Sequence, residues 1–213
     1  KKKIIITILI IMLLNILVIN IAPEIITSWA FEKKKYSIMS EELNEKIKNH
    51  IEENEKIAYL TFDDGPYKYT DQLLDILDKY NIKATFFTTS AYPDYAYCIK
   101  EEAQRGHTVA VHTATHNYSK LYASTDAYWA DFNQQNAVIE QQTGSKSKLF
   151  RFPGGSSNTV SRNYCSGVVS QIAQQSKQKG YVYFDWNVSS GDAGETSSSD
   201  VVFNNVTTQI AAN

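Results

Sequence analysis

Cysteine is scarce in this sequence, and basic residues are not in excess. The two cysteines, Cys98 and Cys165, form no Cys-x-x-Cys pair and cannot bind a metal cluster alone. They could form one disulfide in an oxidising compartment, but nothing in the sequence places them together, and we expect free thiols. The formal net charge of −2 gives no electrostatic basis for binding nucleic acid. The composition therefore argues against a cysteine cluster and against a nucleic-acid partner.

Apolar and aromatic residues, in contrast, are plentiful. Of the 213 residues, 43% are hydrophobic, which is enough for one domain with a sizeable core and a short additional segment. The chain also contains 14 Tyr, 9 Phe and 3 Trp. Tyr and Trp combine a flat apolar face with a polar edge, which suits a sugar-binding groove, although most of them are expected in the core or on the ordinary surface.

The N-terminal segment combines a basic flank with a long apolar run. Three lysines precede residues 4–21, which contain few polar side chains. This pattern predicts a secretory signal peptide or a signal anchor over residues 1–30. The length of the run favours a membrane-anchoring helix, whereas Ser28-Trp29-Ala30 offers a small-x-small cleavage site, so both alternatives stay open. In either case the rest of the chain is expected outside the cytoplasm.

Two further regions follow this segment. Residues 31–56 are rich in charge and are interpreted as a solvated, partly helical stalk. Residues 57–213 alternate between predicted strands and predicted helices, which indicates an α/β fold with a parallel sheet, either doubly wound or closed into a barrel. Strands are predicted over 57–62, 84–89, 108–111, 148–152 and 181–187, and helices over 70–80, 93–105, 125–142, 161–179 and 198–212.

Chemically reactive side chains follow the predicted strands at their carboxyl ends. Because these ends share one face of a parallel sheet, the side chains are expected to form one site. Taken alone, the Asp-Asp-Gly-Pro sequence after the first strand is equally suited to a tight turn, and the coincidence at the other strands favours a site. The residues concerned are Asp63 and Asp64 after the first strand, His112 after the third, Arg151 after the fourth, and Asp185 and Trp186 after the fifth.

His112 and His116 form an H-x3-H motif. On one helical turn, residues i and i+4 project to the same side, so both imidazoles could reach one ion. Two histidines with one carboxylate and open positions are typical of a catalytic zinc site, and Co²⁺ or Ni²⁺ would also fit. An isolated H-x3-H is often incidental, so the nearby carboxylates are what favour a metal site. His107 precedes the third strand and is interpreted as structural.

TFDDGP, HTATH, RFPGG and FDW, in this order, resemble the polysaccharide deacetylase family, carbohydrate esterase family 4. The resemblance runs from about Ile57 to the last residue, and TFDDGP together with H-x3-H is its most specific part. It implies a distorted (β/α) barrel with more strands than the five predicted here, and we expect a monomer. It also implies that Asp63 is the catalytic base and that Asp64, His112 and His116 hold the metal.

Further roles follow from the same resemblance. Arg151 would orient Asp63, and the backbone N–H of Gly154 would help to stabilise the oxyanion. Asp185, grouped with the catalytic residues, and Trp186 would form one wall of the groove. Tyrosines on the loops of this face could stack on sugar rings, or could be ordinary loop aromatics; these are Tyr67, Tyr69, Tyr118 and Tyr122.

The sequence departs from the family pattern in three respects. The family has a late L-x-H motif whose histidine is the general acid, but no histidine follows His116. Five strands are too few to close the barrel. Both departures predict that the C-terminal part of a longer natural chain is missing. In addition, Val182 stands where the family often has an Asp, and we expect this difference to tune the groove.

The predicted function is metal-dependent removal of N-acetyl groups from N-acetylglucosamine units of a cell-wall polysaccharide. Export and a short stalk would place the domain in the bacterial cell envelope, membrane-anchored or secreted, where peptidoglycan is the favoured substrate. Chitin oligomers, N-acetylmuramic acid and O-acetylated xylan are alternative substrates. An alternative from another class is a catalytically inactive module that binds wall polysaccharide but lacks the general acid.

Overall fold

The computed structural model describes residues 57–212 of the chain. The expected signal peptide or anchor over residues 1–30 and the expected stalk over residues 31–56 lie outside the described residues. Within the described part, no helix combines the length and the apolar character that crossing a membrane requires.

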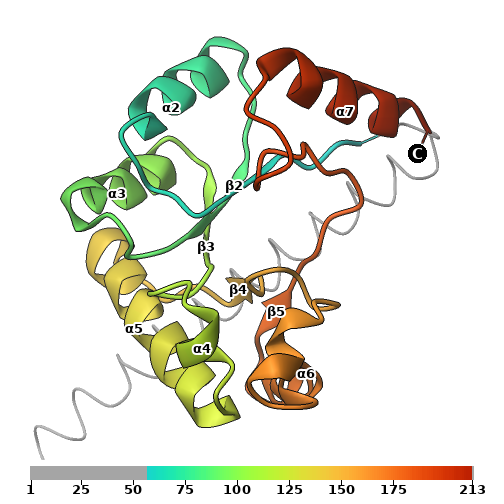
Figure 1. Cartoon of the computed structure of the whole chain (residues 1–213). Coiled ribbons are helices and arrows are strands. Elements are labelled where there is room, and N and C mark those ends of the chain that lie inside the picture. Colours follow the sequence, from blue (N-terminus) through green and yellow to red (C-terminus); the bar gives the residue numbers. More distant parts are fainter. Residues whose placement is uncertain (1–56, 213) are drawn as a thin grey trace, which may run out of the picture. The chain divides into compact units, whose positions relative to one another are not determined.

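A five-stranded parallel sheet organises the described residues (Figure 1). The strands lie in the order β1-β2-β3-β4-β5, which is their order along the chain. A doubly wound sheet reverses its strand order at a switch point, so the sequential order distinguishes this sheet from that alternative. The strands are β1 (Thr61–Asp63), β2 (Thr85–Thr88), β3 (Thr108–Val111), β4 (Leu149–Phe150) and β5 (Val182–Tyr183).

The strand register brings the predicted site residues to one edge of the sheet. Asp63 pairs with Phe87, Thr88 pairs with Val111, and Val111 pairs with Phe150. The residues that directly follow these strands therefore emerge side by side. The strands are rich in β-branched and aromatic residues, which favour the extended conformation. All five predicted strands exist, although most are shorter than predicted.

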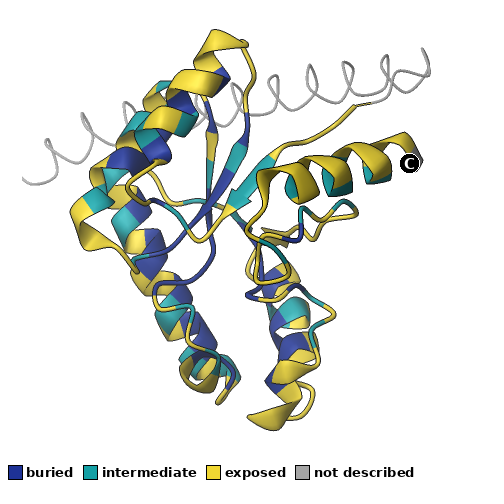
Figure 2. Cartoon of the chain, turned by 45° about the horizontal axis from the view of Figure 1, so that its top comes forward, coloured by how far each residue is buried: buried dark blue, intermediate teal, exposed yellow. Residues whose placement is uncertain are grey.

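Helices connect successive strands. Figure 1 shows α2, α3 and α5 along one side of the sheet, and the faces that they turn towards the strands are buried in Figure 2. The helix predicted over residues 161–179 is instead a short 3₁₀ turn followed by α6, because Gly167 adopts φ 77° at the start of α6. The helices are α2 (Thr70–Lys79), α3 (Tyr97–Gln104), α4 (Tyr118–Leu121), α5 (Thr125–Thr143), α6 (Val168–Gln178) and α7 (Ser199–Ala212), and the 3₁₀ turns are Pro93–Tyr95 and Val160–Asn163.

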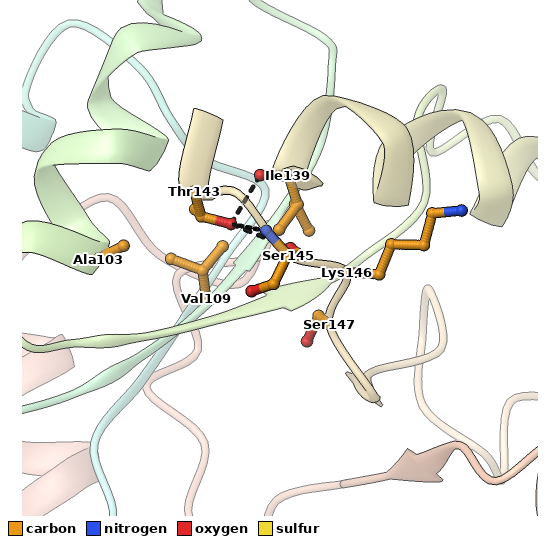
Figure 3. Close-up of a pocket in the computed structure, with 7 residues that line it drawn as sticks. All are labelled: Ala103, Val109, Ile139, Thr143, Ser145, Lys146 and Ser147. Carbon is orange, nitrogen blue, oxygen red and sulfur yellow. Dashed lines mark hydrogen bonds between the residues drawn. The ribbon is translucent and has the colours of Figure 1, made fainter. Parts of the chain in front are cut away.

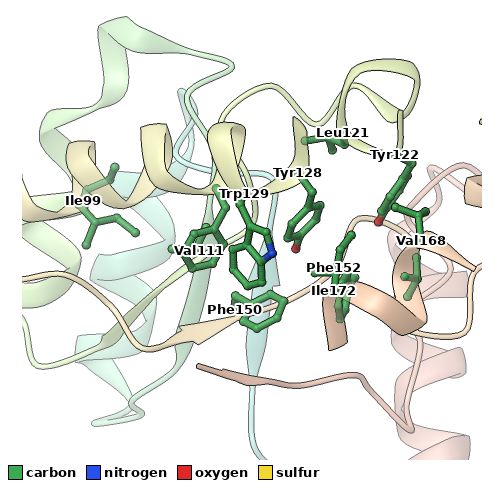
Figure 4. Packing of buried hydrophobic residues seen from close by; sticks show 13 residues of the cluster. Ile99, Val111, Leu121, Tyr122, Tyr128, Trp129, Phe150, Phe152, Val168 and Ile172 are labelled. Atoms are coloured by element: carbon green, nitrogen blue, oxygen red, sulfur yellow. The ribbon is translucent and has the colours of Figure 1, made fainter. Parts of the chain in front are cut away.

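The main hydrophobic core lies between α5, α6 and the sheet (Figure 4). Aromatic side chains of α5 dominate it: the Phe132 ring lies 5.1 Å from Trp129 and 5.5 Å from Phe150, between centroids. Helix α5 is capped at its start by Ser124, whose hydroxyl accepts a hydrogen bond from Ala127 N, and at its end by Gly144 in the left-handed conformation. This packing fixes α5, and with it the polar side chains that α5 carries towards the site.

The sheet is strongly curved. Arg151, directly after β4, donates a 2.9 Å hydrogen bond to the hydroxyl of Thr61 in β1. In a flat sheet, three strand spacings would separate these strands by about 14 Å, which is more than an arginine side chain can bridge. The curvature and the sequential strand order are those of a barrel wall. The predicted α/β fold with a parallel sheet is thus confirmed, while the complete distorted barrel stays a prediction.

Candidate metal and catalytic site

The two acids at the end of β1 differ in exposure. The Asp63 side chain is 28% exposed and the Asp64 side chain 65%. Asp64 has φ 69°, a left-handed conformation that is uncommon for residues other than glycine. Thr89, after β2, holds this turn, because its N–H donates to Gly65 O and its hydroxyl to Asp64 O. The turn suggested by the sequence is therefore present, and the Asp64 carboxylate is the more exposed of the two.

His112 and His116 lie on a loop, not on the helical turn predicted for them. The loop runs from the end of β3 to the start of α4 at Tyr118. Two residues with positive φ, Thr113 at 84° and His116 at 50°, bend it back on itself. Positive φ is a genuine outlier for a β-branched residue such as Thr113, and strain of this kind persists only where the surroundings enforce it.

Asp131 of α5, which the sequence analysis did not identify, holds this loop. Its Oδ1 accepts hydrogen bonds from the backbone N–H groups of Ala114 (2.5 Å) and Thr115 (3.1 Å). Its Oδ2 accepts a third from the Thr115 hydroxyl at 2.6 Å. One turn later, the Gln135 amide donates to the hydroxyl of Thr88, the last residue of β2, and accepts a hydrogen bond from the hydroxyl of Ser90. In the sequence, Asp131 and Gln135 are two polar residues four positions apart beside the apolar stripe of α5. This spacing was the available signal that α5 holds the loops of the site.

Asp64, His112 and His116 converge into one cluster. Asp64 Oδ1 lies 3.5 Å from His112 Nε2 and 3.3 Å from His116 Nε2, and one potential ligand atom from each residue lies within 4.8 Å of the others. His112 Nδ1 lies 2.9 Å from the carbonyl oxygen of Arg151. Because a carbonyl only accepts, Nδ1 carries the proton and Nε2 presents its lone pair to the cluster. These residues fit a divalent metal ion.

Burial favours the form of His112 that binds metals. The side chain is almost completely buried, and this burial lowers its pKa, an effect that Asp64 partly opposes. The imidazole is therefore neutral near pH 7, as a metal ligand must be. Two imidazole nitrogens and one carboxylate oxygen would leave positions for water or substrate, which is the pattern of catalytic rather than structural zinc sites.

Asp63 is held beside this cluster by Arg151. Arg151 Nη1 donates to Asp63 Oδ1 at 2.8 Å, while Asp63 Oδ2 lies 4.0 Å from His112 Nε2. Burial raises the pKa of Asp63, and the charge and hydrogen bond of Arg151 oppose the shift. Arg151 is itself fixed by the carbonyl oxygens of Phe184 and Asp185. The result is an oriented carboxylate whose second oxygen faces the cluster.

The loop after β4 packs closely against the residues after β5. Gly155 adopts φ 79°, and a Cβ at this position would lie 3.3 Å from the Trp186 ring, so glycine allows the close approach. Asp185 accepts hydrogen bonds from both the N–H and the hydroxyl of Ser156. Its carboxylate thus anchors this loop, while its backbone oxygen binds Arg151. The Trp186 side chain remains 46% exposed beside the site.

Of the two tyrosines predicted near the site on the β3 side, only Tyr118 is placed to meet a ligand. Its ring lies 5.7 Å from the His116 ring, and a Cβ on Gly154 would lie 2.5 Å from its hydroxyl. Tyr118 thus stands between the metal-ligand cluster and the Gly154 loop. Of the two alternatives for Tyr122, stacking on a sugar ring is excluded, because Tyr122 is fully buried in the core and donates to Pro153 O.

Other candidates lie away from the site. His107 is buried, and its Nδ1 accepts a hydrogen bond from Ala84 N, which confirms the structural interpretation. Cys98 and Cys165 are free thiols, as expected. A hollow of about 150 Å³ (Figure 3) lies at the amino end of β3 and the carboxyl end of α5, on the edge of the sheet opposite to the site. Its lining includes Val109 and Lys146 and none of the candidate site residues.

Comparisons with known proteins agree with this geometry. The model of the family described as polysaccharide deacetylase matches residues 50–168. A peptidoglycan-N-acetylglucosamine deacetylase of Bacillus cereus is 37% identical over 141 residues, which cover 64% of this chain and 47% of the relative. The chain spans about half the length of the curated relatives that head this comparison, at 47% and 46%.

Two solved structures share the fold. The catalytic domain of peptidoglycan N-acetylglucosamine deacetylase from Eubacterium rectale is 52% identical, with a TM-score of 0.72 over 73% of this chain and 71% of that one. A polysaccharide deacetylase from Bacillus cereus is 31% identical, with a TM-score of 0.62 over 74% of this chain and 73% of that one.

Proposed function

Because the chain belongs to the polysaccharide deacetylase family, we propose that it removes acetyl groups from N-acetylglucosamine units of a cell-wall polysaccharide. Peptidoglycan is the favoured polymer, since relatives named for this activity occur both in the curated comparison and among the solved structures. The observation that carries the proposal is an oriented carboxylate, Asp63, beside a separate cluster of three potential metal ligands.

The metal ligands in this proposal are Asp64, His112 and His116. The ion would be Zn²⁺, with Co²⁺ or Ni²⁺ as alternatives, since two imidazoles and one carboxylate suit all three. A bound ion supplies two effects, a lower pKa of its coordinated water and polarisation of the substrate carbonyl. Residues of this chain would supply the general base, the oxyanion donor and the contacts with the sugar.

Asp63 serves as the general base. Its Oδ2 faces the cluster while Arg151 holds its Oδ1, so the carboxylate can accept a proton from the attacking water. A raised pKa strengthens a carboxylate as a base, and burial of Asp63 acts in this direction. Arg151 limits this shift and fixes the orientation. Asp63 is deprotonated before the step and protonated after it.

The loop after β4 and the aromatic side chains complete the site in this proposal. Gly154 is exposed, and its N–H donates to the oxyanion of the tetrahedral intermediate. Tyr118 and Trp186 contact the sugar on either side, and Asp185 keeps the Gly154 loop in place through Ser156. When the C–N bond breaks, the departing amine takes up a proton, which the family resemblance assigns to the histidine of an L-x-H motif.

The same proposal includes the setting of the enzyme. A polymer of the cell wall is reached outside the cytoplasm, so the protein acts in the cell envelope, either anchored through residues 1–30 or released. The curved sheet belongs to a distorted (β/α) barrel, and the protein acts as a monomer. The curvature and sequential strand order support the barrel.

The test is release of acetate and free amine from N-acetylglucosamine oligomers and from peptidoglycan. The full-length protein, loaded with Zn²⁺, is compared with Asp63→Asn. We expect metal-dependent release by the parent and a loss of at least about 10²-fold in the variant, with metal content unchanged. Binding of peptidoglycan by the Zn²⁺-loaded parent with no release from any acetylated sugar would overturn the proposal and favour the inactive binding module.

A further inference from the structure

The backbone N–H proposed as oxyanion donor lies in a tight turn after β4. Gly155 N donates to Phe152 O at 2.8 Å, which closes a turn over residues 152–155. Pro153 fixes a negative φ at the second position of this turn, and Gly154 has φ 77° at the third. Positive φ at the third position alone defines a type II turn. The Gly154 N–H therefore belongs to the central peptide of a type II turn.

The direction of this central peptide is not fixed by the ends of the turn. Type I and type II turns share their ends, but they differ by about 150–170° in ψ of the second residue and φ of the third. This difference turns the central peptide over, so that its N–H and its C=O exchange sides. Glycine accepts both signs of φ, so Gly154 permits both forms. Something outside the turn must therefore hold the peptide in one orientation.

A buried tyrosine binds the carbonyl of the same peptide. The Tyr122 hydroxyl donates to Pro153 O at 2.8 Å, from a side chain that is fully buried in the core. Burial raises the pKa of Tyr122, so the hydroxyl stays protonated and can donate. Asn158 Nδ2 lies 3.4 Å from the same oxygen and donates to Gly155 O at 2.7 Å. Pro153 O is thus held on the core side of the turn by one short and one longer hydrogen bond.

The geometry of the peptide transfers this hold to the N–H. The Pro153–Gly154 peptide is trans, and a trans peptide is planar with its C=O and N–H directed to opposite sides. Pro153 is buried and Gly154 is exposed, so an inward carbonyl leaves the N–H directed outward. Among residues 57–212 no acceptor binds Gly154 N, so it is available to a ligand. Turning the peptide over would leave the buried Tyr122 hydroxyl without its acceptor, which is unfavourable.

We propose that Tyr122 is a positioning residue that locks the Pro153–Gly154 peptide in the orientation in which the Gly154 N–H serves as oxyanion donor. This inference rests on the proposed function. Tyr122 acts through the peptide and not by contact with the substrate. Without the hydroxyl, the flipped peptide becomes populated, and in that form the donor faces away from the substrate. Because an oxyanion forms only in the reaction, the loss should appear in kcat and not in KM.

The kinetic test compares Tyr122→Phe with Tyr128→Phe. Both tyrosines are fully buried in the same core with ring centroids 6.1 Å apart, but the Tyr128 hydroxyl has no hydrogen-bond partner within the described part of the chain. The Zn²⁺-loaded full-length protein is assayed on N-acetylglucosamine hexamer. We expect Tyr122→Phe to lower kcat about threefold to tenfold, as expected for one hydrogen bond, with KM and Zn²⁺ affinity unchanged. Tyr128→Phe should match the parent.

A second measurement observes the peptide itself, without substrate. A Pro-Gly pair occurs once among the 213 residues, so ¹³C-carbonyl proline combined with ¹⁵N-glycine selects the Gly154 amide in NMR spectra. We expect μs–ms exchange at this amide in relaxation dispersion of Zn²⁺-loaded Tyr122→Phe, and none in the parent or in Tyr128→Phe. Melting temperatures establish that each variant is folded. If Tyr122→Phe is not, Asn158→Ala removes the longer hydrogen bond to Pro153 O and should show the same exchange and loss of kcat, both weaker.

The outcomes separate this inference from the proposed function. A parent-like kcat in folded Tyr122→Phe would overturn the inference, whether or not the Gly154 amide exchanges. An equal loss of kcat in Tyr128→Phe, or a loss while the Gly154 amide stays static, would also overturn it, since either result would indicate a general effect on the core. Absence of acetate release by the parent from every acetylated sugar would instead contradict the proposed function.

Discussion

Glu102 of α3 should make the stability of the protein fall as the pH rises. Its side chain is 0% exposed, and neither carboxylate oxygen has a hydrogen-bond partner among residues 57–212. Burial raises the pKa of Glu102 from 4.5 to about 8. The native state therefore holds a proton that the unfolded chain releases. A variant without the carboxylate should lose this pH dependence of the free energy of unfolding.

The magnitude follows from proton linkage. Below pH 4.5 both states are protonated and Glu102 adds no pH dependence. Between pH 4.5 and about 8, the native state binds one proton more, so the free energy of unfolding falls by about 1.4 kcal/mol per pH unit. From pH 5 to pH 8 this amounts to a loss of about 4 kcal/mol. Replacing the carboxylate by an apolar side chain of similar size, Glu102→Met, should remove this loss.

The assay is urea unfolding of the parent and of Glu102→Met at pH 5, 6, 7 and 8, with a chelator present. Other titrating groups contribute equally to both proteins, so the difference between them isolates Glu102. We expect the variant to be the more stable protein at pH 8, with the gap closing towards pH 5. Glu101→Gln is the control, since Glu101 is a partly exposed neighbour. Parallel pH profiles for parent and Glu102→Met would refute the reasoning.

Three further predictions concern the site. Arg151→Met should lower the free energy of unfolding by about 1.5–3 kcal/mol in denaturant titrations, because it removes a charged hydrogen bond to the partly exposed Asp63 carboxylate. His116→Ala should lose tightly bound Zn²⁺ by elemental analysis, and an unchanged metal content would exclude His116 as a ligand. Gly155→Ala should reduce activity while metal content is retained. The alanine Cβ would lie 3.3 Å from the Trp186 ring, and residue 155 has a φ of 79°. Full activity of this variant would show that the loop can move without loss of function.

The sequence predicted the elements and the face of the site better than it predicted local conformation. Strands and helices followed from hydrophobic periodicity and from glycine and proline punctuation, and the strand-end positions of Asp63, His112 and Arg151 placed them together. These signals are local or depend only on the regular geometry of a parallel sheet. The break before α6 was missed because Gly167 lies inside a segment that otherwise favours a helix.

The conformation of the His112–His116 loop could not be read from the sequence. A spacing of four residues is compatible with a helical turn, and the sequence contains no glycine at Thr113 or His116 to signal positive φ. The conformation depends on Asp131, a contact from another helix. The burial of Tyr122 likewise depends on tertiary packing, because a tyrosine after a strand suits a groove and a core equally well.

Because Arg151 links β4 to β1 across the curved sheet, it determines how the site loses its geometry when the protein opens locally. Its contact with Thr61 joins positions 90 residues apart in the chain. Separation of β1 from the β4–β5 side and misalignment of Asp63 are therefore a single event. Hydrogen exchange would report this opening at the amides of β1, and it can occur below the free energy of global unfolding. On heating, turnover should then decline in parallel with protection of these amides, while the aromatic core around α5 is still intact.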